Sequence, residues 1–285
     1  MNYQNTRALA LWGNYLNERA GYIRPDEVDA LTDLGLSAQQ AVAQLVACAC
    51  GLDVENNPKD KELFHTYFLP IVKELSVETY RQDAYYTRLL GCQGQAGAFC
   101  LTEQKHQPYE CFVRNDLITG SNAEVLPQIG FFAEEFIYPA VLENGRIWMS
   151  ITPNEIETMR GPLSRARGRV LTYGLGLGYF AFHASEKETV EQVTVVERNP
   201  QALTLFADYL LPFFSHPEKI CLKCADAFEV ASAPAVVSSY DYVFADIWRD
   251  VSDGLTLYKR LKALEPAGIK TKFDYWIEPT LRFYL

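Results

Sequence analysis

The stretch that decides the fold reads Val170-Leu171-Thr172-Tyr173-Gly174-Leu175-Gly176-Leu177-Gly178-Tyr179. A short apolar run precedes three glycines at alternate positions, and a helical pattern starts at Tyr179. Glycines between a strand and a helix permit a tight turn, close approach of a ligand, and close packing of helix on strand. We call residues 174–178 the glycine loop. Its G-x-G-x-G spacing differs from the dinucleotide-binding G-x-G-x-x-G, and a turn without a ligand is the alternative interpretation.

Segments with strand and helix patterns alternate after this loop. The expected strands cover residues 170–173, 193–197, 220–224, 242–246 and 273–278. The expected helices cover residues 179–185, 200–211, 227–231 and 254–264. Such alternation is typical of parallel βαβ units with helices on both faces of the sheet. We therefore predict an α/β fold, with a Rossmann-like parallel sheet in residues 168–285.

Acidic residues stand at the ends of three expected strands. Glu197 ends the second strand, 19 residues after Gly178, and a carboxylate there can accept hydrogen bonds from ribose hydroxyls. Asp226 follows the third strand and could accept a hydrogen bond from an adenine amino group, whereas Asp246 ends the fourth. Ligands of open α/β sheets bind at this carboxyl edge. The alternatives are a solvated acid for Glu197 and a helix cap for Asp226.

The order of glycine loop, Glu197, Ala225-Asp226-Ala227 and Asp246 resembles that of the class I S-adenosylmethionine-dependent methyltransferases. The resemblance covers residues 168–278. Within that superfamily the chain is most similar to the spermidine synthase-like branch, in which a β-rich segment and a helix with a short acidic motif precede the loop. Residues 148–159 have that character here.

The resemblance implies that S-adenosylmethionine is the cofactor. The glycine loop would line its methionine portion, Glu197 would hold its ribose, and Asp226 with the backbone of Ala227 would face its adenine. The implied cofactor-binding residues are Gly174, Gly176, Gly178, Glu197, Asp226 and Ala227. An acidic pocket also suits a sulfonium cation better than an anionic dinucleotide.

The resemblance places Asp246 nearest the reacting group, as the catalytic residue that orients or deprotonates an acceptor amine or hydroxyl. Trp248 would close the pocket over that acceptor. The predicted reaction is methyl transfer to an unidentified small molecule. One alternative is aminopropyl transfer onto a diamine, with Asp246, Asp250 and Glu278 as an acidic acceptor pocket. The other is an adenosyl-ligand-binding protein without catalysis.

Three features depart from the family pattern. Thr172 stands where an acidic residue often precedes the first glycine by two positions. Residues 246–250 read Asp-Ile-Trp-Arg-Asp, whereas spermidine synthases have Asp-Ser-Ser-Asp. The terminal hairpin of two further strands is also expected to be absent, which would leave an open sheet edge or a homodimer contact.

The chain before the glycine loop divides into two expected segments, a helical region over residues 1–95 and a small β-rich segment with a connecting helix over residues 96–167. The expected helices cover residues 7–19, 41–50 and 67–88 and two segments that begin at Pro25 and Pro58. Ser37 and Gln40 are typical of a capping box. Asn144-Gly145 indicates a hairpin. Residues 168–285 form the third expected domain.

The acids Glu155 and Glu157 follow Pro153 at the start of the connecting helix. Acids in a first helical turn stabilise the helix dipole, and that interpretation is favoured over contacts with a substrate.

Composition excludes several classes of function. The 36 acidic residues outnumber the 26 basic ones, and the net charge of −10 disfavours nucleic acid as a partner. Neither a membrane span nor a secretory signal is recognisable. The seven scattered cysteines indicate reduced thiols and a cytoplasmic location. No metal site is expected, because Cys221 and Cys224 are predicted to be core residues of a strand.

Overall fold

The computed structural model describes residues 2–285. Contacts group the chain into two compact units, Met1–Arg81 with Lys105–Ile137, and Gln82–Gln104 with Tyr138–Leu285. The strands β3 (Phe99–His106) and β6 (Phe136–Glu143) each run from one unit into the other. The sequence predicts a different division, into three segments by their expected secondary structure. That division stays a prediction, because the two units here are defined by contacts.

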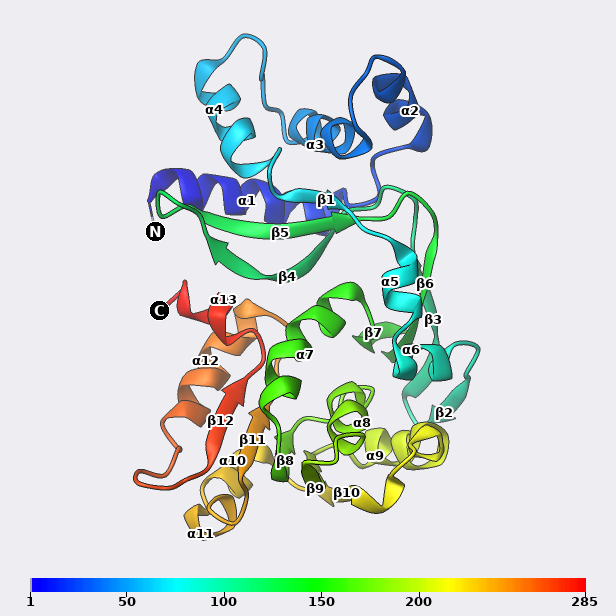
Figure 1. Cartoon of the computed structure of the whole chain (residues 1–285), viewed down its shortest axis with the longest axis vertical. Helices are drawn as coiled ribbons and strands as arrows, with labels where there is room; N and C mark the ends of the chain where they lie inside the picture. Colours follow the sequence, from blue (N-terminus) through cyan, green and yellow to red (C-terminus); the bar gives the residue numbers. More distant parts are fainter. Residues whose placement is uncertain (1) are drawn as a thin grey trace. The chain divides into compact units, whose positions relative to one another are not determined.

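The first unit packs helices and a small sheet around one apolar core (Figure 1). Its elements are α1 (Tyr3–Glu18), α2 (Pro25–Asp33), α3 (Ala38–Ala49), α4 (Pro58–Tyr67), β1 (Val72–Glu74), α5 (Val77–Arg81), β4 (Phe112–Thr119) and β5 (Val125–Phe131). The strands lie in the order β1-β5-β4. In the core, the Trp12 ring stacks on Phe68 with centroids 5.0 Å apart.

Local capping predicted several helix starts in this unit correctly. The Ser37 hydroxyl accepts a hydrogen bond from the Gln40 N–H at 3.2 Å, and the Gln40 side chain accepts one from the Ser37 N–H at 2.9 Å. The continuous helix expected over residues 67–88 is wrong. Because Pro70 lacks an N–H and restricts the residue before it, α4 ends at Tyr67, and β1, α5 and α6 (Ala84–Leu89) follow.

The second unit contains a sheet with strand order β2-β3-β6-β7, in which β2 is Gly94–Ala96 and β7 is Arg146–Ser150. The expected hairpin is confirmed, because Asn144 and Gly145 join β6 to β7 with φ of 51° and 78°. The β3 strand lies within residues 96–167, the segment that the sequence predicts to be β-rich.

A five-stranded parallel sheet dominates this unit, with strand order β10-β9-β8-β11-β12. Its strands are β8 (Gly168–Tyr173), β9 (Val190–Glu197), β10 (Ile220–Cys224), β11 (Tyr242–Ala245) and β12 (Lys272–Tyr275). Numbered along the chain, the order is 3-2-1-4-5, which is that of a Rossmann-like sheet. The predicted fold class is therefore confirmed.

Short helices connect and flank these strands. They are α7 (Pro153–Arg165), α8 (Tyr179–Ser185), α9 (Pro200–Leu205), α10 (Ala227–Ala231), α11 (Pro234–Val237), α12 (Val251–Lys262) and α13 (Glu278–Arg282). The helix expected over residues 200–211 continues after α9 as a π-helical turn at Phe206–Leu210 and a 3-10 turn at Leu211–Phe213. The strand expected to reach Glu278 ends at Tyr275 instead, because Glu278 begins α13.

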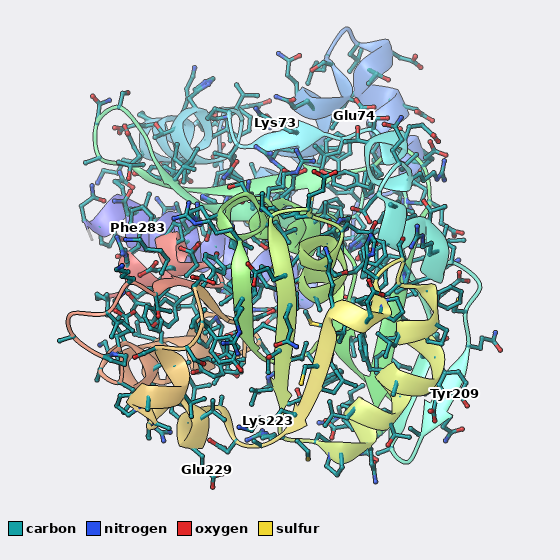
Figure 2. All side chains as sticks on the ribbon, turned by 60° about the horizontal axis from the view of Figure 1, so that its bottom comes forward. Lys73, Glu74, Tyr209, Lys223, Glu229 and Phe283 are labelled. Carbon is teal, nitrogen blue, oxygen red and sulfur yellow. The ribbon has the colours of Figure 1, made fainter. Side chains whose placement is uncertain are left out.

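The expectation that Cys221 and Cys224 are core residues is wrong, because β10 is an edge strand and both thiols are exposed. Figure 2 shows Lys223 of the same strand and Glu229 of α10 at the outside of this unit. Among residues 2–285, no helix combines the length and apolar character that crossing a membrane requires.

Candidate functional site

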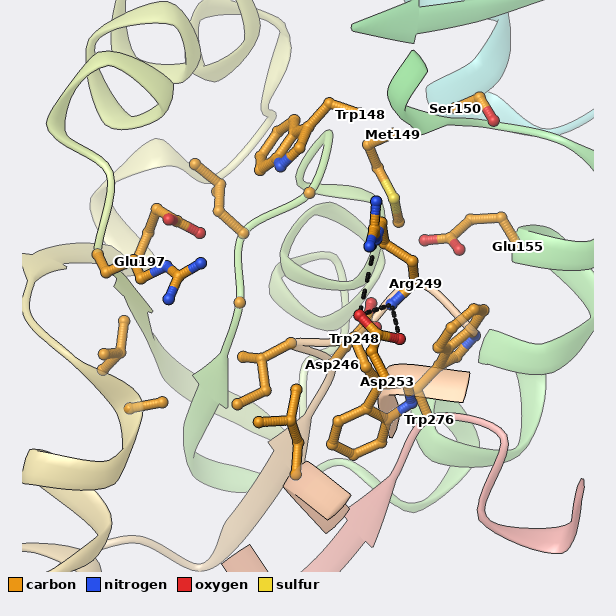
Figure 3. Close-up of a pocket in the computed structure, with 18 of the residues that line it drawn as sticks. Trp148, Met149, Ser150, Glu155, Glu197, Asp246, Trp248, Arg249, Asp253 and Trp276 are labelled. Atoms are coloured by element: carbon orange, nitrogen blue, oxygen red, sulfur yellow. Dashed lines mark hydrogen bonds and ion pairs between the residues drawn. The ribbon is translucent and has the colours of Figure 1, made fainter. Parts of the chain in front are cut away.

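A cavity of about 500 Å³ lies within the second unit, at the carboxyl edge of the parallel sheet (Figure 3). The cavity arises from the register of the parallel strands, which aligns their carboxyl ends. The residue before Gly174 pairs with the residues that precede Glu197 on β9 and Asp246 on β11, so the three strands end side by side. Residues after β10, the strand β7 and the start of α7 complete the wall. The cavity thus gathers most of the residues that the sequence singled out.

Each glycine of the loop has a positive φ, of 96°, 52° and 80° for Gly174, Gly176 and Gly178. A Cβ on Gly174 would lie 1.9 Å from the Asp246 carbonyl oxygen, and one on Gly178 would lie 2.3 Å from the Phe206 ring. Gly174 and Gly176 line the cavity, whereas Gly178 precedes α8 and serves its packing. The loop therefore lies directly against neighbouring backbone and side chains.

Glu197 and Asp226 both line the cavity. Glu197 is 9% exposed and accepts a hydrogen bond from the Asn199 N–H at 2.8 Å, and burial raises the pKa of its carboxyl. One oxygen of Asp226 accepts from the Phe228 N–H at 2.7 Å and from the Glu229 N–H at 3.4 Å. The capping alternative for Asp226 is therefore observed, while the residue still borders the cavity together with Ala227.

Two carboxyls face the other end of the cavity, Asp246 directly after β11 and Glu155 in the first turn of α7. Glu155 is 5% exposed. Across residues 2–285, neither carboxyl takes part in a hydrogen bond or an ion pair. Burial raises the pKa of Asp246 to about 7, and burial and the charge of Asp246 together raise the pKa of Glu155. Two carboxyls that line one cavity resist ionising together, so protonation of the pair is favoured over that of an isolated carboxyl.

Glu155 thus lines the cavity, whereas the sequence pattern favoured a role for this acid in stabilising the helix dipole alone. Glu157, two residues further along α7, pairs with Arg160 at 2.9 Å and lies outside the cavity. The helical period separates the two acids onto different faces of α7. Nothing in the local sequence distinguishes them, because the difference arises from where α7 meets the sheet edge.

Aromatic side chains supply much of the remaining wall. Three of the four tryptophans line the cavity, namely Trp148, Trp248 and Trp276. The Trp276 indole donates to the Thr158 hydroxyl at 2.9 Å, and the buried Trp248 indole N–H has no hydrogen-bond partner among residues 2–285. The predicted position of Trp248 at the pocket is therefore observed, whereas Trp148 and Trp276 were not among the predicted site residues.

Two expected acceptor residues lie elsewhere. Asp250 caps α12 by accepting the Ser252 N–H at 2.6 Å, and Glu278 accepts from the Tyr258 hydroxyl at 2.7 Å and pairs with Arg282. Neither lines the cavity in the described part of the chain. The acidic acceptor pocket of Asp246, Asp250 and Glu278 is therefore not formed, and Glu155 is the acid that accompanies Asp246.

No group of three or more His, Cys, Asp or Glu side chains within residues 2–285 is arranged to hold a metal ion. The charged groups of the cavity are mostly acidic, with Arg198 and Arg249 as its basic members. Arg249 is largely exposed and lies 3.6 Å from Asp253. The site is therefore an acidic, aromatic cavity next to a glycine loop.

Together these observations define a Rossmann-like α/β protein with a cavity at the carboxyl edge of its parallel sheet. No protein-family model matches the chain, and the search of curated proteins gives no match. Among solved structures, spermidine synthase from Thermotoga maritima matches with 13% sequence identity and a TM-score of 0.33. The match covers 61% of this chain and 52% of that enzyme, so the chain spans about half of its length.

Proposed function

We propose that the protein is an S-adenosylmethionine-dependent methyltransferase that acts on a small-molecule acceptor. The observation that carries this proposal is that one cavity gathers Gly174 and Gly176 of the glycine loop, Glu197, Asp226 with Ala227, and Asp246. These residues follow adjacent parallel strands, where open α/β sheets bind their ligands.

The residues of the cavity fit this cofactor in size, shape and charge. A volume of about 500 Å³ is within the usual range of small-molecule sites. Gly174 and Gly176 line the cavity and present backbone without a side chain, which a ligand can approach closely. The unpaired carboxyls of Glu155 and Asp246 favour a cation, and they would repel the phosphates of a dinucleotide.

Some residues of the cavity would bind the cofactor, and others would position the acceptor. When bound, S-adenosylmethionine supplies an electrophilic methyl group. Glu197 would accept hydrogen bonds from the ribose hydroxyls, and Asp226 with Ala227 would border the adenine. Asp246 would orient the acceptor and take its proton. Positioning of two reactants is worth up to about 7–11 kcal/mol, so few catalytic side chains are needed.

A second candidate is aminopropyl transfer from decarboxylated S-adenosylmethionine to a diamine. The observation that favours it is the Glu155–Asp246 pair, because two carboxyls without protein partners suit an ammonium group of the acceptor. The tryptophan walls add faces on which a cation can lie.

The test supplies the full chain with either donor and a mixture of small metabolites, and mass spectrometry follows new products. The proposal expects methylated products from S-adenosylmethionine that are lost in Asp246→Asn. Aminopropylated products instead would establish the second candidate. Binding of both donors without any product would identify a non-catalytic adenosyl-ligand-binding protein and contradict both transfer reactions.

A further inference from the structure

We propose that Glu155 and Asp246 form a proton-linked cation sensor, which keeps a proton when the cavity holds a neutral ligand and releases it to solvent when a sulfonium cation occupies the cavity. The inference rests on the proposed function, because it takes the sulfonium donor and its neutral thioether product as the two ligands. It goes further in assigning Glu155 a role and in predicting how the site distinguishes these ligands.

Both carboxyls line the cavity, and neither forms an ion pair with a side chain of residues 2–285. Glu155 comes from α7 and Asp246 from the end of β11, two segments far apart in the chain, and both line one cavity. Figure 3 shows Glu155 extending from α7 into the cavity, on the side where Asp246 and Arg249 lie. The Trp276 indole is already bound to Thr158, so it is not available as a donor to Glu155.

The charged and titratable groups around the pair are engaged elsewhere. On α7 itself, Arg160 pairs with Glu157. On α8, the Tyr179 hydroxyl donates to Asp83 at 2.8 Å. The remaining neighbours belong to the loop after β11 and to α12, where Arg249 lies beside Asp253.

The two acids at the far end of the cavity, Glu197 and Asp226, also form hydrogen bonds with backbone groups near them in the chain. Glu197 accepts the Asn199 N–H, and Asp226 caps α10. Arg198 directly follows Glu197 and partly offsets its charge. The pair of Glu155 and Asp246 therefore has no dedicated counter-cation within the described residues.

The direction of the proton linkage follows from this arrangement. Burial raises the pKa of both carboxyls, so the ligand-free pair carries a proton near neutral pH. A cation beside the pair stabilises the ionised form and lowers its pKa, and the proton leaves to solvent. Binding of S-adenosylmethionine should therefore tighten as pH rises through neutrality. Binding of neutral S-adenosylhomocysteine should stay nearly constant.

Titration calorimetry on the full chain tests the inference in two buffers of different ionisation enthalpy. The expected result is release of up to about one proton with S-adenosylmethionine and almost none with S-adenosylhomocysteine. Glu155→Gln and Asp246→Asn should each remove most of this release while S-adenosylhomocysteine still binds, which also shows that the variants are folded. Glu157→Gln, on the same helix but outside the cavity, should behave as the wild type.

Two outcomes would overturn the inference. If S-adenosylmethionine binds without proton release, or if Glu155→Gln and Asp246→Asn release as much as the wild type, the pair is not the sensor although the proposed function stands. If neither adenosyl ligand binds to the wild type, the proposed function fails and the sensor fails with it.

Discussion

Gly174 occupies a position in the glycine loop where a residue with a Cβ atom would not fit. Its φ of 96° is strained for other residues by about 1–2 kcal/mol, and its Cβ would meet a backbone oxygen that cannot rotate away. Gly174→Ala should therefore destabilise the second unit by that strain plus about 1–3 kcal/mol of overpacking. Gly268 is the matched control, because it has a φ of 75° in open space. Denaturant unfolding followed by tryptophan fluorescence measures both variants, and equal losses would contradict the steric argument.

Glu197 should contribute to ligand affinity rather than to folding. Removing one partner of a charge-assisted hydrogen bond costs about 1.5–3 kcal/mol, so Glu197→Ala should weaken S-adenosylhomocysteine binding by about ten- to a hundredfold. Glu191→Ala is the control, because this acid is exposed on the same strand. Calorimetry compares the two. Unchanged affinity in Glu197→Ala would make Glu197 a structural acid only.

Asp246 should affect turnover far more than the binding of the neutral product. Asp246→Asn keeps the shape of the side chain, and we expect S-adenosylhomocysteine affinity within about threefold of the wild type. Turnover of an identified acceptor should fall by about 10²–10⁴, the usual contribution of a positioned acid or base. A parallel loss of affinity and turnover would place Asp246 in the cofactor site instead.

At the scale of elements, Asp83 ties the start of α6 to α8. One carboxylate oxygen accepts the Tyr85 and Tyr86 N–H groups at 3.0 and 2.9 Å, and the other lies 2.8 Å from the Tyr179 hydroxyl and 3.1 Å from His183. Burial works to raise the pKa of Asp83, but the contact with the His183 ring and hydrogen bonds from Tyr86 and Tyr179 lower it overall. Its contribution to stability is therefore present above the usual carboxyl pKa and is lost as pH falls through the lowered value.

Replacing Asp83 by Ala should reduce stability near neutral pH by about 1–3 kcal/mol, from the lost helix cap and the lost bond to Tyr179. Tyr179→Phe removes only the hydroxyl and should lose about 0.5–1.5 kcal/mol. Denaturant unfolding at neutral pH ranks the two variants. A larger loss in Tyr179→Phe would show that the cap contributes little.

Helices and strands whose ends are fixed by neighbouring residues were predictable from the sequence. The bounds of α8, β10 and α10 agree with the expectation, because glycine, proline and a capping Asp226 delimit them. The error over residues 67–88 has a local cause, Pro70 just after the end of α4, and also a non-local one. The short strand β1 exists because Val72 pairs with Ile129, far along the chain, and no local pattern contains that pairing.

The same distinction applies to the candidate site. The glycine loop, Glu197, Asp226 and Asp246 follow strands, and the parallel topology alone brings strand ends together. Glu155 and Trp276 reach the cavity through the packing of α7 and of the segment after β12, which depends on the folded structure. Sequence therefore identified the sheet edge of the site together with Asp246 and Trp248, but not Glu155, Trp148 or Trp276.

For the protein as a whole, we expect the cavity of the second unit to bind an adenosyl ligand and not a dinucleotide. The most direct measurement is titration calorimetry of the full chain with S-adenosylhomocysteine and, separately, with NAD. We predict saturable binding of S-adenosylhomocysteine and no measurable heat with NAD, because the G-x-G-x-G spacing and the unpaired carboxyls disfavour a pyrophosphate. Tighter binding of NAD, or no binding of either adenosyl ligand, would contradict it.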